Sequence, residues 1–272
     1  VVGEIPRELS GLYLRNGPNP MSPVNNKKHH WFAGEGMLHG LRIDEGKALW
    51  YRNQSVGNAN THVISHGGKI YATVEAGAAP VEVNGELMPT GNDAFNGTLT
   101  SGFSAHAKLD KENGELHALC YQFPRGSYQV DHVVVGQDGH VQKTQSIDLP
   151  SQTMLHECAI TNNYVLVFDL SVTFSLFKLV RGYFPFSWNE KHQARIGLLP
   201  RKAGEETVQW FDIDPCYLFH TFNACEDDNG NVVVDAMRYQ RLFDEDWNGP
   251  FTESPPMLAR WNLDVTTGRS TE

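Results

Sequence analysis

The sequence predicts an all-β fold, and three features support that prediction. Short apolar or alternating runs recur along the 272 residues, and Gly, Asn and Asp residues interrupt them at short intervals. Helical periodicity is scarce, and its best candidate, 174–180, is as easily a loop. No Pro-rich or Ser-rich linker divides the chain, so we expect residues 1–272 to form one domain.

The expected strands follow one another with a turn signal between neighbours. Turns at 44–46, 67–68, 137–139, 161–163 and 227–230 carry the residues that favour tight hairpins. The runs around these turns predict strands at 38–43, 47–52, 62–65, 69–75, 116–123, 130–135, 140–147, 164–170 and 232–238. Repeated hairpins of this kind form a sandwich or a propeller, and no fixed-period repeat chooses between them.

Composition excludes several classes of protein. The formal net charge of −10 argues against a nucleic-acid partner, because phosphate binding needs clustered Lys and Arg. Four cysteines are far apart and form no CxxC pair, which predicts reduced, mostly buried thiols. No run reaches the ~20 apolar residues of a membrane span, and the first residues are not a signal peptide. We therefore expect a cytoplasmic protein.

The segment from 166 to 188 is unusually apolar and aromatic. Its first third has the pattern of a core strand, but the remainder, with Lys178 and Arg181 interspersed, is too apolar for an ordinary surface loop. A hydrophobic substrate mouth or a patch that touches a membrane explains this remainder as well as plain core does.

Most of the 12 histidines have local sequences typical of ordinary positions. Polar or turn neighbours predict solvated side chains at His29, His30, His66, His117, His140 and His192. Apolar alternation predicts core or half-buried positions for His62 and His132.

Three further histidines share one pattern. His106, His156 and His220 each have apolar neighbours and precede a turn or hairpin. In a radially repeating sheet, equivalent points of successive blades converge on the central axis, so these imidazoles would meet there. Imidazole suits iron, copper, zinc and nickel, so the ligand type alone does not name the metal.

Glu75 is the candidate partner for one of these imidazoles. It ends the apolar run 69–75, and a ligating His usually passes its other N–H to a carboxylate or carbonyl. Simple exposure at the end of a strand is the alternative explanation for this carboxylate.

These residues carry a resemblance to a known family. Residues 5–20, which include Leu14-Arg15-Asn16-Gly17-Pro18, resemble the N-terminal signature of the carotenoid cleavage oxygenases, and 31–39 resembles their F-x-G-D-G-M-x-H stretch, with Glu35 in place of Asp. The segments around His106, His156 and His220 resemble the first three metal-ligand motifs of that family in their order.

The resemblance implies a seven-bladed β-propeller in which four His hold Fe(II) and three Glu support them. It places Glu75 in the position of the first of those Glu residues. The implied reaction inserts O₂ across a double bond of a carotenoid or apocarotenoid polyene and gives two carbonyl products. An apolar tunnel and mouth are implied too, and we assign their walls to Phe103, Phe174, Phe177 and Phe184. Peripheral contact with a membrane would suit such a substrate.

Two departures from the family pattern affect these expectations. No His follows His220, so the fourth ligand is absent. We expect an N-terminal portion of a longer domain that lacks its last blades and does not turn over alone. Val74 stands where stilbene-cleaving members carry Lys, which favours carotenoid or apocarotenoid substrates. The alternatives are a stilbene-type dioxygenase, a non-catalytic propeller that serves as a binding module, and a three-His zinc hydrolase.

Overall fold

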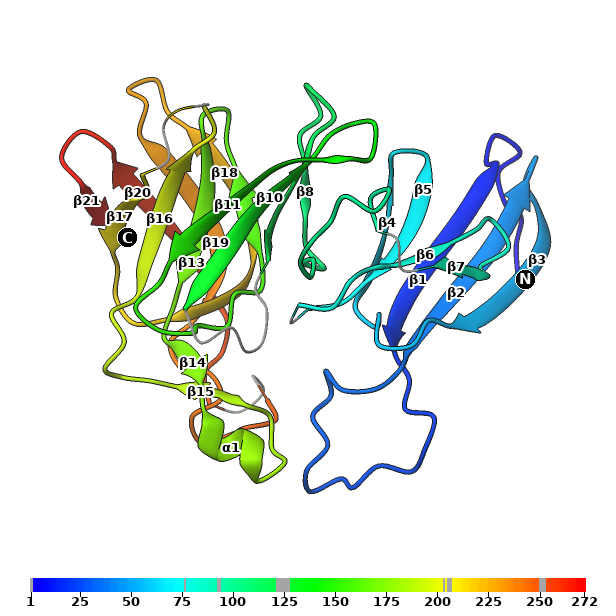
Figure 1. The fold of residues 1–272 in the computed structure, drawn as a ribbon, viewed down its shortest axis with the longest axis horizontal. Coiled ribbons are helices and arrows are strands. Elements are labelled where there is room, and N and C mark those ends of the chain that lie inside the picture. The colour runs from blue at the N-terminus through cyan, green and yellow to red at the C-terminus, as the bar shows by residue number, and fades with distance from the viewer. Residues whose placement is uncertain are drawn as a thin grey trace.

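The computed structural model describes residues 2–75, 77–91, 94–120, 128–202, 204, 207–249 and 253–272. Within these ranges the chain is almost entirely β, with strands β1 to β21 and the single short helix α1 (Leu176–Val180) (Figure 1). The all-β prediction is therefore confirmed, and the ambiguous segment 174–180 contains the helix.

The strands form successive antiparallel sheets that follow chain order. The first sheet consists of β1 (Gly11–Pro18), β2 (Gly36–Asp44) and β3 (Lys47–Ser55). The second consists of β4 (His62–His66), β5 (Lys69–Thr73), β6 (Val81–Val83) and β7 (Pro89–Gly91). The third consists of β8 (Lys108–Leu109), β9 (Leu116–Cys120), β10 (Gln129–Val135) and β11 (Val141–Asp148).

Two further four-stranded sheets and a small hairpin complete the described chain. The fourth sheet consists of β12 (Cys158–Ile160), β13 (Tyr164–Asp169), β16 (Arg195–Pro200) and β17 (Gln209–Asp212). The fifth consists of β18 (Tyr217–Glu226), β19 (Val232–Tyr239), β20 (Met257–Asp264) and β21 (Arg269–Thr271). The hairpin of β14 (Val172–Phe174) and β15 (Phe186–Trp188) carries α1 between its strands.

Residues that tolerate positive φ determine where the hairpins turn. Between β2 and β3, Glu45 and Gly46 both have positive φ, 44° and 73°, as the tightest hairpin turns require. Gly139 has φ of 78° in the turn before β11, where glycine adopts the left-handed conformation without steric cost. The turn signals read from the sequence therefore lie where the chain reverses.

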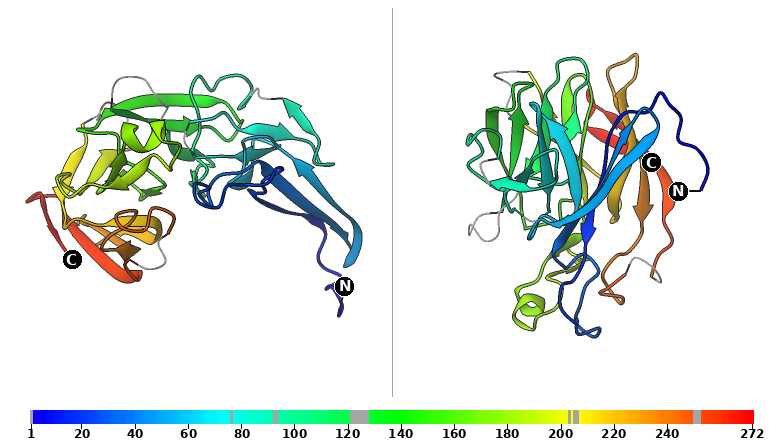
Figure 2. Two further views of the ribbon diagram at one scale, coloured as in Figure 1. Left: turned by 90° about the horizontal axis from the view of Figure 1, so that it is seen from below. Right: turned by 90° about the vertical axis from the view of Figure 1, so that its right-hand side faces the viewer.

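The sheets fan out in an arc, with the N-terminal sheet at one end and the C-terminal sheet at the other (Figure 2). The first strands of successive sheets contact one another: β8 contacts β12, and β12 contacts β18. This is the arrangement of propeller blades around an axis, with the first strand of each blade innermost. Residues at the starts of these strands are thereby brought together.

Alternating burial along the strands forms the core between the sheets. In β20, Ala259, Trp261 and Leu263 are at most 4% exposed while their neighbours face outward. The largest cluster of buried side chains joins the fourth and fifth sheets with β14 and β15. These packed sheets hold the innermost strands in place.

The predicted strands match the structure closely, with defined differences. The strand expected at 69–75 ends at Thr73, so Glu75 follows the strand rather than closing it. The strand expected at 116–123 is β9, and positions 121–123 lie outside the described residues. All four cysteines are free thiols, and three are buried, as predicted.

The histidine predictions were only partly right. His132 is buried, as expected. The prediction of solvated side chains was wrong for four histidines, all at most 8% exposed: His30, His66, His117 and His192. Each contacts a group far away in the sequence, such as the Asp169 carboxylate 2.8 Å from His192 Nε2. Local sequence does not contain that information.

Candidate metal centre

Three imidazoles converge at the innermost strands. His106 lies just before β8, His156 just before β12, and His220 within β18. Their ring centroids are 4.5 Å (His106–His156), 4.7 Å (His106–His220) and 4.9 Å (His156–His220) apart. One nitrogen of each ring lies within 4.8 Å of the others. We call these three residues the histidine cluster.

The cluster is arranged to offer lone pairs. Burial, with the neighbouring His220, lowers the pKa of His106 to about 4. Burial also lowers the pKa of His156, with further contributions from His106 and His220. Both rings are therefore neutral at pH 7, which metal coordination requires. His106 Nε2 is buried and has no hydrogen-bond partner among the described residues. A buried nitrogen of this kind needs a partner, and a metal ion would supply it.

Glu157 fixes the orientation of His220. The ring nitrogen Nδ1 of His220 lies 2.7 Å from Glu157 Oε2, and the backbone N–H and hydroxyl of Thr221 both donate to Oε1 at 2.6 Å. Lys108 Nζ lies 3.1 Å from Oε2. A carboxylate can only accept, so the proton of neutral His220 is on Nδ1 and the lone pair on Nε2.

The charge on Glu157 is held in place by its partners. Burial opposes that charge, but hydrogen bonds from His220 and Thr221 and the ammonium of Lys108 lower the pKa of Glu157 to about 2. The sequence analysis did not identify this residue. Its only local signal is that it directly follows His156, and its partner His220 is on a different sheet.

Glu75, the predicted partner of an imidazole, contacts the segment that carries His106. Its Oε1 accepts a hydrogen bond from the backbone N–H of Ala105 at 3.0 Å. The nearest approach to His106 Nε2 is 3.8 Å, too long for a hydrogen bond. Desolvation raises the pKa of Glu75 to about 8. Glu75 thus holds the backbone that presents His106.

Half-buried aromatic side chains form a wall beside the cluster. Phe219 lies edge-on to His156, with centroids 5.1 Å apart, and Phe32 lies 6.4 Å from His156 in a stacked orientation. Phe184 continues this wall at 5.8 Å from Phe32 and stacks on His30 at 4.0 Å. Of these, only Phe184 was assigned to a substrate wall from the sequence. Phe219 directly precedes His220, which is the signal that could have identified it.

The other predicted tunnel residues lie in different surroundings. Phe103 is 1% exposed and packs 4.7 Å from Phe95 in the core. It offers no surface to a ligand, so assigning it to a substrate wall was wrong. Phe174 is half-buried on β14, 6.1 Å from Phe186. Phe177 is 63% exposed on α1 and lies on the outer surface, so its place at a substrate entry stays a prediction.

Comparison with known proteins decides the family. The family model of retinal pigment epithelial membrane protein matches residues 1–57 and 52–272. The carotenoid cleavage oxygenase of Mycobacterium tuberculosis is 36% identical over 338 aligned residues, covering 100% of this chain. The chain belongs to the carotenoid cleavage oxygenase family. It is therefore a member of an enzyme family of oxygenases, and the resemblance read from its motifs is confirmed.

Other members of the carotenoid cleavage oxygenases match over less of their length. The carotenoid 9,10(9',10')-cleavage dioxygenase of Crocus sativus is 29% identical over 86% of this chain. The chain spans 67% of the Mycobacterium tuberculosis protein but only 52% of the Crocus sativus protein. It thus corresponds to between half and two thirds of these relatives.

Solved structures of carotenoid cleavage oxygenases show the same fold. The lignostilbene dioxygenase of Pseudomonas brassicacearum superposes with a TM-score of 0.85 at 24% identity, over 98% of this chain and 65% of that one. A variant of the Synechocystis apocarotenoid oxygenase gives a TM-score of 0.83 at 20% identity, over 99% of this chain and 67% of that one. The five sheets are therefore part of the propeller of this family. Among the described residues, no helix is long and apolar enough to cross a membrane.

Proposed function

We propose that the complete protein is a non-haem Fe(II) dioxygenase that cleaves a carbon–carbon double bond of a carotenoid or apocarotenoid. The convergence of the histidine cluster carries this proposal. Three imidazoles from three separate sheets point at one another with a nitrogen of each within 4.8 Å. Hairpins distant in sequence have no structural need to bring two half-buried imidazoles and a third, more exposed one together.

The residues of the cluster fit an iron ion. Neutral imidazole nitrogens suit Fe(II), and they leave its double charge uncompensated by their own charge. The proton on His220 Nδ1 directs the Nε2 lone pair away from Glu157, and the unpartnered Nε2 of His106 is available as a second ligand. When bound, the ion would supply the site that activates O₂.

The protein residues would position the substrate and keep water away. Phe219, Phe32 and Phe184 form an apolar wall that continues outward from His156. Such a wall selects a polyene by shape and by exclusion of water rather than by hydrogen bonds. The overall reaction consumes one C=C bond and one O₂ and places one oxygen atom in each carbonyl product. Val74, beside Glu75, offers no charge to a substrate phenol, which favours a polyene.

The exposed face of α1 would let the protein extract such a substrate from a membrane. Leu176, Phe177 and Val180 are each at least 63% exposed on this short helix. Arg181 lies over the ring of Phe177 at 4.0 Å, and Lys178 is held by the carbonyl of Phe243 at 3.4 Å. Exposed apolar side chains flanked by cations are typical of a peripheral contact with a lipid surface.

Metal analysis combined with isotope labelling tests the proposal. The complete protein should carry about one iron per chain, and an apocarotenal incubated with ¹⁸O₂ should give two carbonyl products, each labelled at its new oxygen. A folded protein without iron would favour the non-catalytic propeller. Activity that persists without O₂ would favour a zinc hydrolase. Both results would overturn the proposal.

A matched pair of substrates tests the substrate class. The same preparation is incubated with an apocarotenal and with a 4-hydroxystilbene of the lignostilbene type. We expect cleavage of the apocarotenal and little cleavage of the stilbene, because the residue before Glu75 is Val74. Cleavage of the stilbene alone would reject the carotenoid assignment while leaving the iron centre intact.

A further inference from the structure

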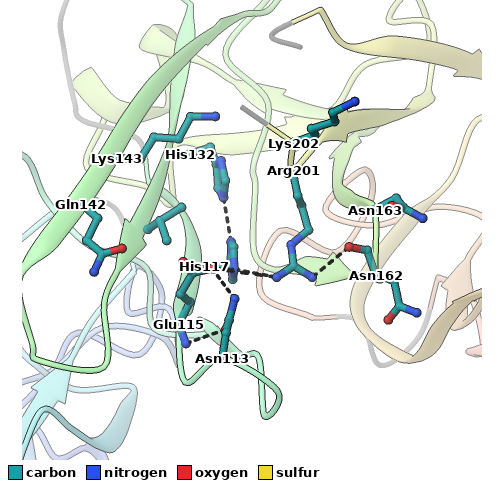
Figure 3. Close-up of a pocket in the computed structure, with 11 residues that line it drawn as sticks. Asn113, Glu115, His117, His132, Gln142, Lys143, Asn162, Asn163, Arg201 and Lys202 are labelled. Carbon is teal, nitrogen blue, oxygen red and sulfur yellow. Dashed lines mark hydrogen bonds and ion pairs between the residues drawn. The ribbon is translucent and has the colours of Figure 1, made fainter. Parts of the chain in front are cut away.

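A pocket lies away from the histidine cluster. It has a volume of about 510 Å³ and lies between the third and fourth sheets (Figure 3). Its described lining residues are Asn113, Glu115, His117, His132, Val134, Gln142, Lys143, Asn162, Asn163, Arg201 and Lys202. No member of the histidine cluster lines it, and nothing in the proposed oxygenase function uses it.

The lining is cationic although the protein is acidic. Among the described lining residues, Lys143, Arg201 and Lys202 stand against the single carboxylate of Glu115. The whole chain carries a formal charge of −10. A local excess of positive charge in an acidic protein raises the concentration of small anions at that point.

The side chain of Arg201 is held in place in the wall of this pocket. Its Nη1 donates to the carbonyl of Thr161 at 2.6 Å, and its Nη2 forms an ion pair with Asp110. The same Nη2 lies 3.4 Å from His117 Nε2 and 4.0 Å from Glu115. We call Asp110, Glu115 and His117 the acidic cluster. Its three ligand atoms could in principle hold a metal, but Nη2 already contacts all three, so we assign no metal there.

A buried imidazole pair connects Arg201 to the pocket. His117 and His132 stack with centroids 5.4 Å apart and an interplanar angle of 8°, and His117 Nδ1 lies 3.1 Å from His132 Nε2. The Arg201 guanidinium can only donate, so its hydrogen bond makes His117 Nε2 an acceptor, whereas the Glu115 carboxylate, 3.4 Å from the same nitrogen, would accept from it in the other tautomer. In the tautomer that Arg201 favours, the His117 proton is on Nδ1 and donates to His132 Nε2, which leaves the His132 proton on Nδ1.

That last nitrogen has no partner. His132 is 2% exposed, and its Nδ1 forms no hydrogen bond with any described residue. In that tautomer Nδ1 carries a buried N–H without an acceptor, which is unfavourable, and a bound anion would supply the acceptor. His132 lines the pocket between Lys143 and Arg201 (Figure 3). The unpartnered donor therefore lies where two cations would flank an acceptor.

We propose that this pocket binds a phosphate group, either free phosphate or that of a small organic phosphate. Lys143 would neutralise its charge and His132 would donate Nδ1–H, beside the fixed Arg201 guanidinium. Lys143 forms no hydrogen bond or ion pair with any residue that the structure describes, so its ammonium is available. Side-chain amides such as Gln142 add donors around a group with several acceptor oxygens.

Calorimetric titration with inorganic phosphate, with sodium chloride at matched ionic strength, tests the site. We expect saturable binding that chloride does not reproduce, and we expect Lys143→Met to weaken it about tenfold, the loss of one charge-assisted contact. Lys47→Met is the matched control, because Lys47 is exposed on β3 in another sheet. It should bind phosphate like the unmodified protein.

Further titrations distinguish an organic phosphate from the free ion and define the results that would overturn the proposal. Tighter binding of glycerol phosphate than of inorganic phosphate would identify an organic phosphate, and equal binding would identify the free ion. His132→Gln should also weaken binding, and if that variant does not fold, Lys143→Met still decides. An effect equal to that of chloride, or equal binding by Lys143→Met and Lys47→Met, would overturn the proposal.

Discussion

The histidine cluster and the acidic cluster are alike in spacing but differ in charge, because the first is made of imidazoles and the second contains two carboxylates. Each brings three metal-ligating atoms within 4.8 Å of one another. In the acidic cluster Arg201 Nη2 contacts all three members, whereas in the histidine cluster His106 Nε2 has no hydrogen-bond partner among the described residues. A guanidinium is always charged, so it holds the place of a cation permanently. Spacing alone therefore does not make a metal site. The charged groups already present determine whether the cluster can bind a metal ion.

The surroundings of the two clusters reinforce this difference. In the histidine cluster the nearest cation, Lys108, is neutralised by Glu157, which also orients His220. In the acidic cluster the carboxylate of Asp110 is paired with Arg201, whose hydrogen bond lowers the pKa of Asp110. The histidine cluster therefore presents neutral nitrogen donors to a metal ion. The acidic cluster needs no metal ion, because Arg201 already supplies its positive charge.

The largest expected effect comes from removing a ring of the histidine cluster. His156→Ala should reduce iron affinity by at least 100-fold and abolish cleavage, because the ion loses one of its ligands. Iron content by atomic emission measures this directly. His117→Ala, in the acidic cluster, should retain full iron content, and equal losses in both variants would remove the distinction between the clusters.

Removing the resident cation should change the acidic cluster in two ways. Arg201→Met leaves the half-buried carboxylates of Asp110 and Glu115 without their counter-charge, and we expect a loss of ~2 kcal/mol in the free energy of unfolding. The same variant should gain weak binding of Zn²⁺, visible as a second equivalent in calorimetry. Arg260→Met is the control, because its pair with Asp235 is 64% exposed on the arginine side. It should change the free energy of unfolding by less than ~1 kcal/mol. If Arg201→Met neither lost stability nor gained Zn²⁺ binding, Arg201 would not be what keeps a metal out of the acidic cluster.

Glu157→Gln should have the next largest effect. The amide retains the shape but loses the charge that holds His220 Nδ1–H, so we expect iron affinity to fall ~10-fold to 100-fold. Competition with a chelator of known affinity measures the change. Glu157→Asp should restore part of the affinity, whereas a variant at exposed Glu86 should leave it unchanged. Unchanged affinity in Glu157→Gln would show that the carboxylate does not act on the metal centre.

The smallest effect is the pH dependence of stability at His132. Burial lowers its pKa from 6.5 to about 3 in the folded protein. Between these values the unfolded chain binds a proton that the folded chain does not. The free energy of unfolding should therefore fall as pH falls, by about 1.4 kcal/mol per pH unit for this histidine. Urea unfolding between pH 6 and 4 should show a shallower slope in His132→Gln than in His140→Gln, which alters an exposed side chain. Equal slopes would mean that His132 is protonated in the fold.

The sequence predicted what depends on local pattern. Turn residues such as Gly46 and Gly139 located the hairpins, and the repeated hairpin context of His106, His156 and His220 predicted that they would meet. Their convergence follows from blade geometry, which every hairpin of the repeat shares. The resemblance to the family supplied the number of blades, which periodicity did not.

Contacts between segments that are distant in the chain could not be predicted from the sequence. His117 has polar neighbours that predict exposure, yet it is buried because Arg201 and His132 come from other strands. Glu157 looked unremarkable beside His156 because its partner His220 is on the next sheet. Phe103 shares the aromatic character of a tunnel residue, and only packing against Phe95 shows that it is core. Strands of two or three residues, such as β8, carry too few positions for a period to be read.

Anomalous diffraction at the iron edge from crystals of the complete protein is the most direct test of the central claim. We predict one strong peak within coordinating distance of His106, His156 and His220, and none at the acidic cluster. A peak beside Arg201, or a fully folded protein with no peak among the three imidazoles, would contradict the account.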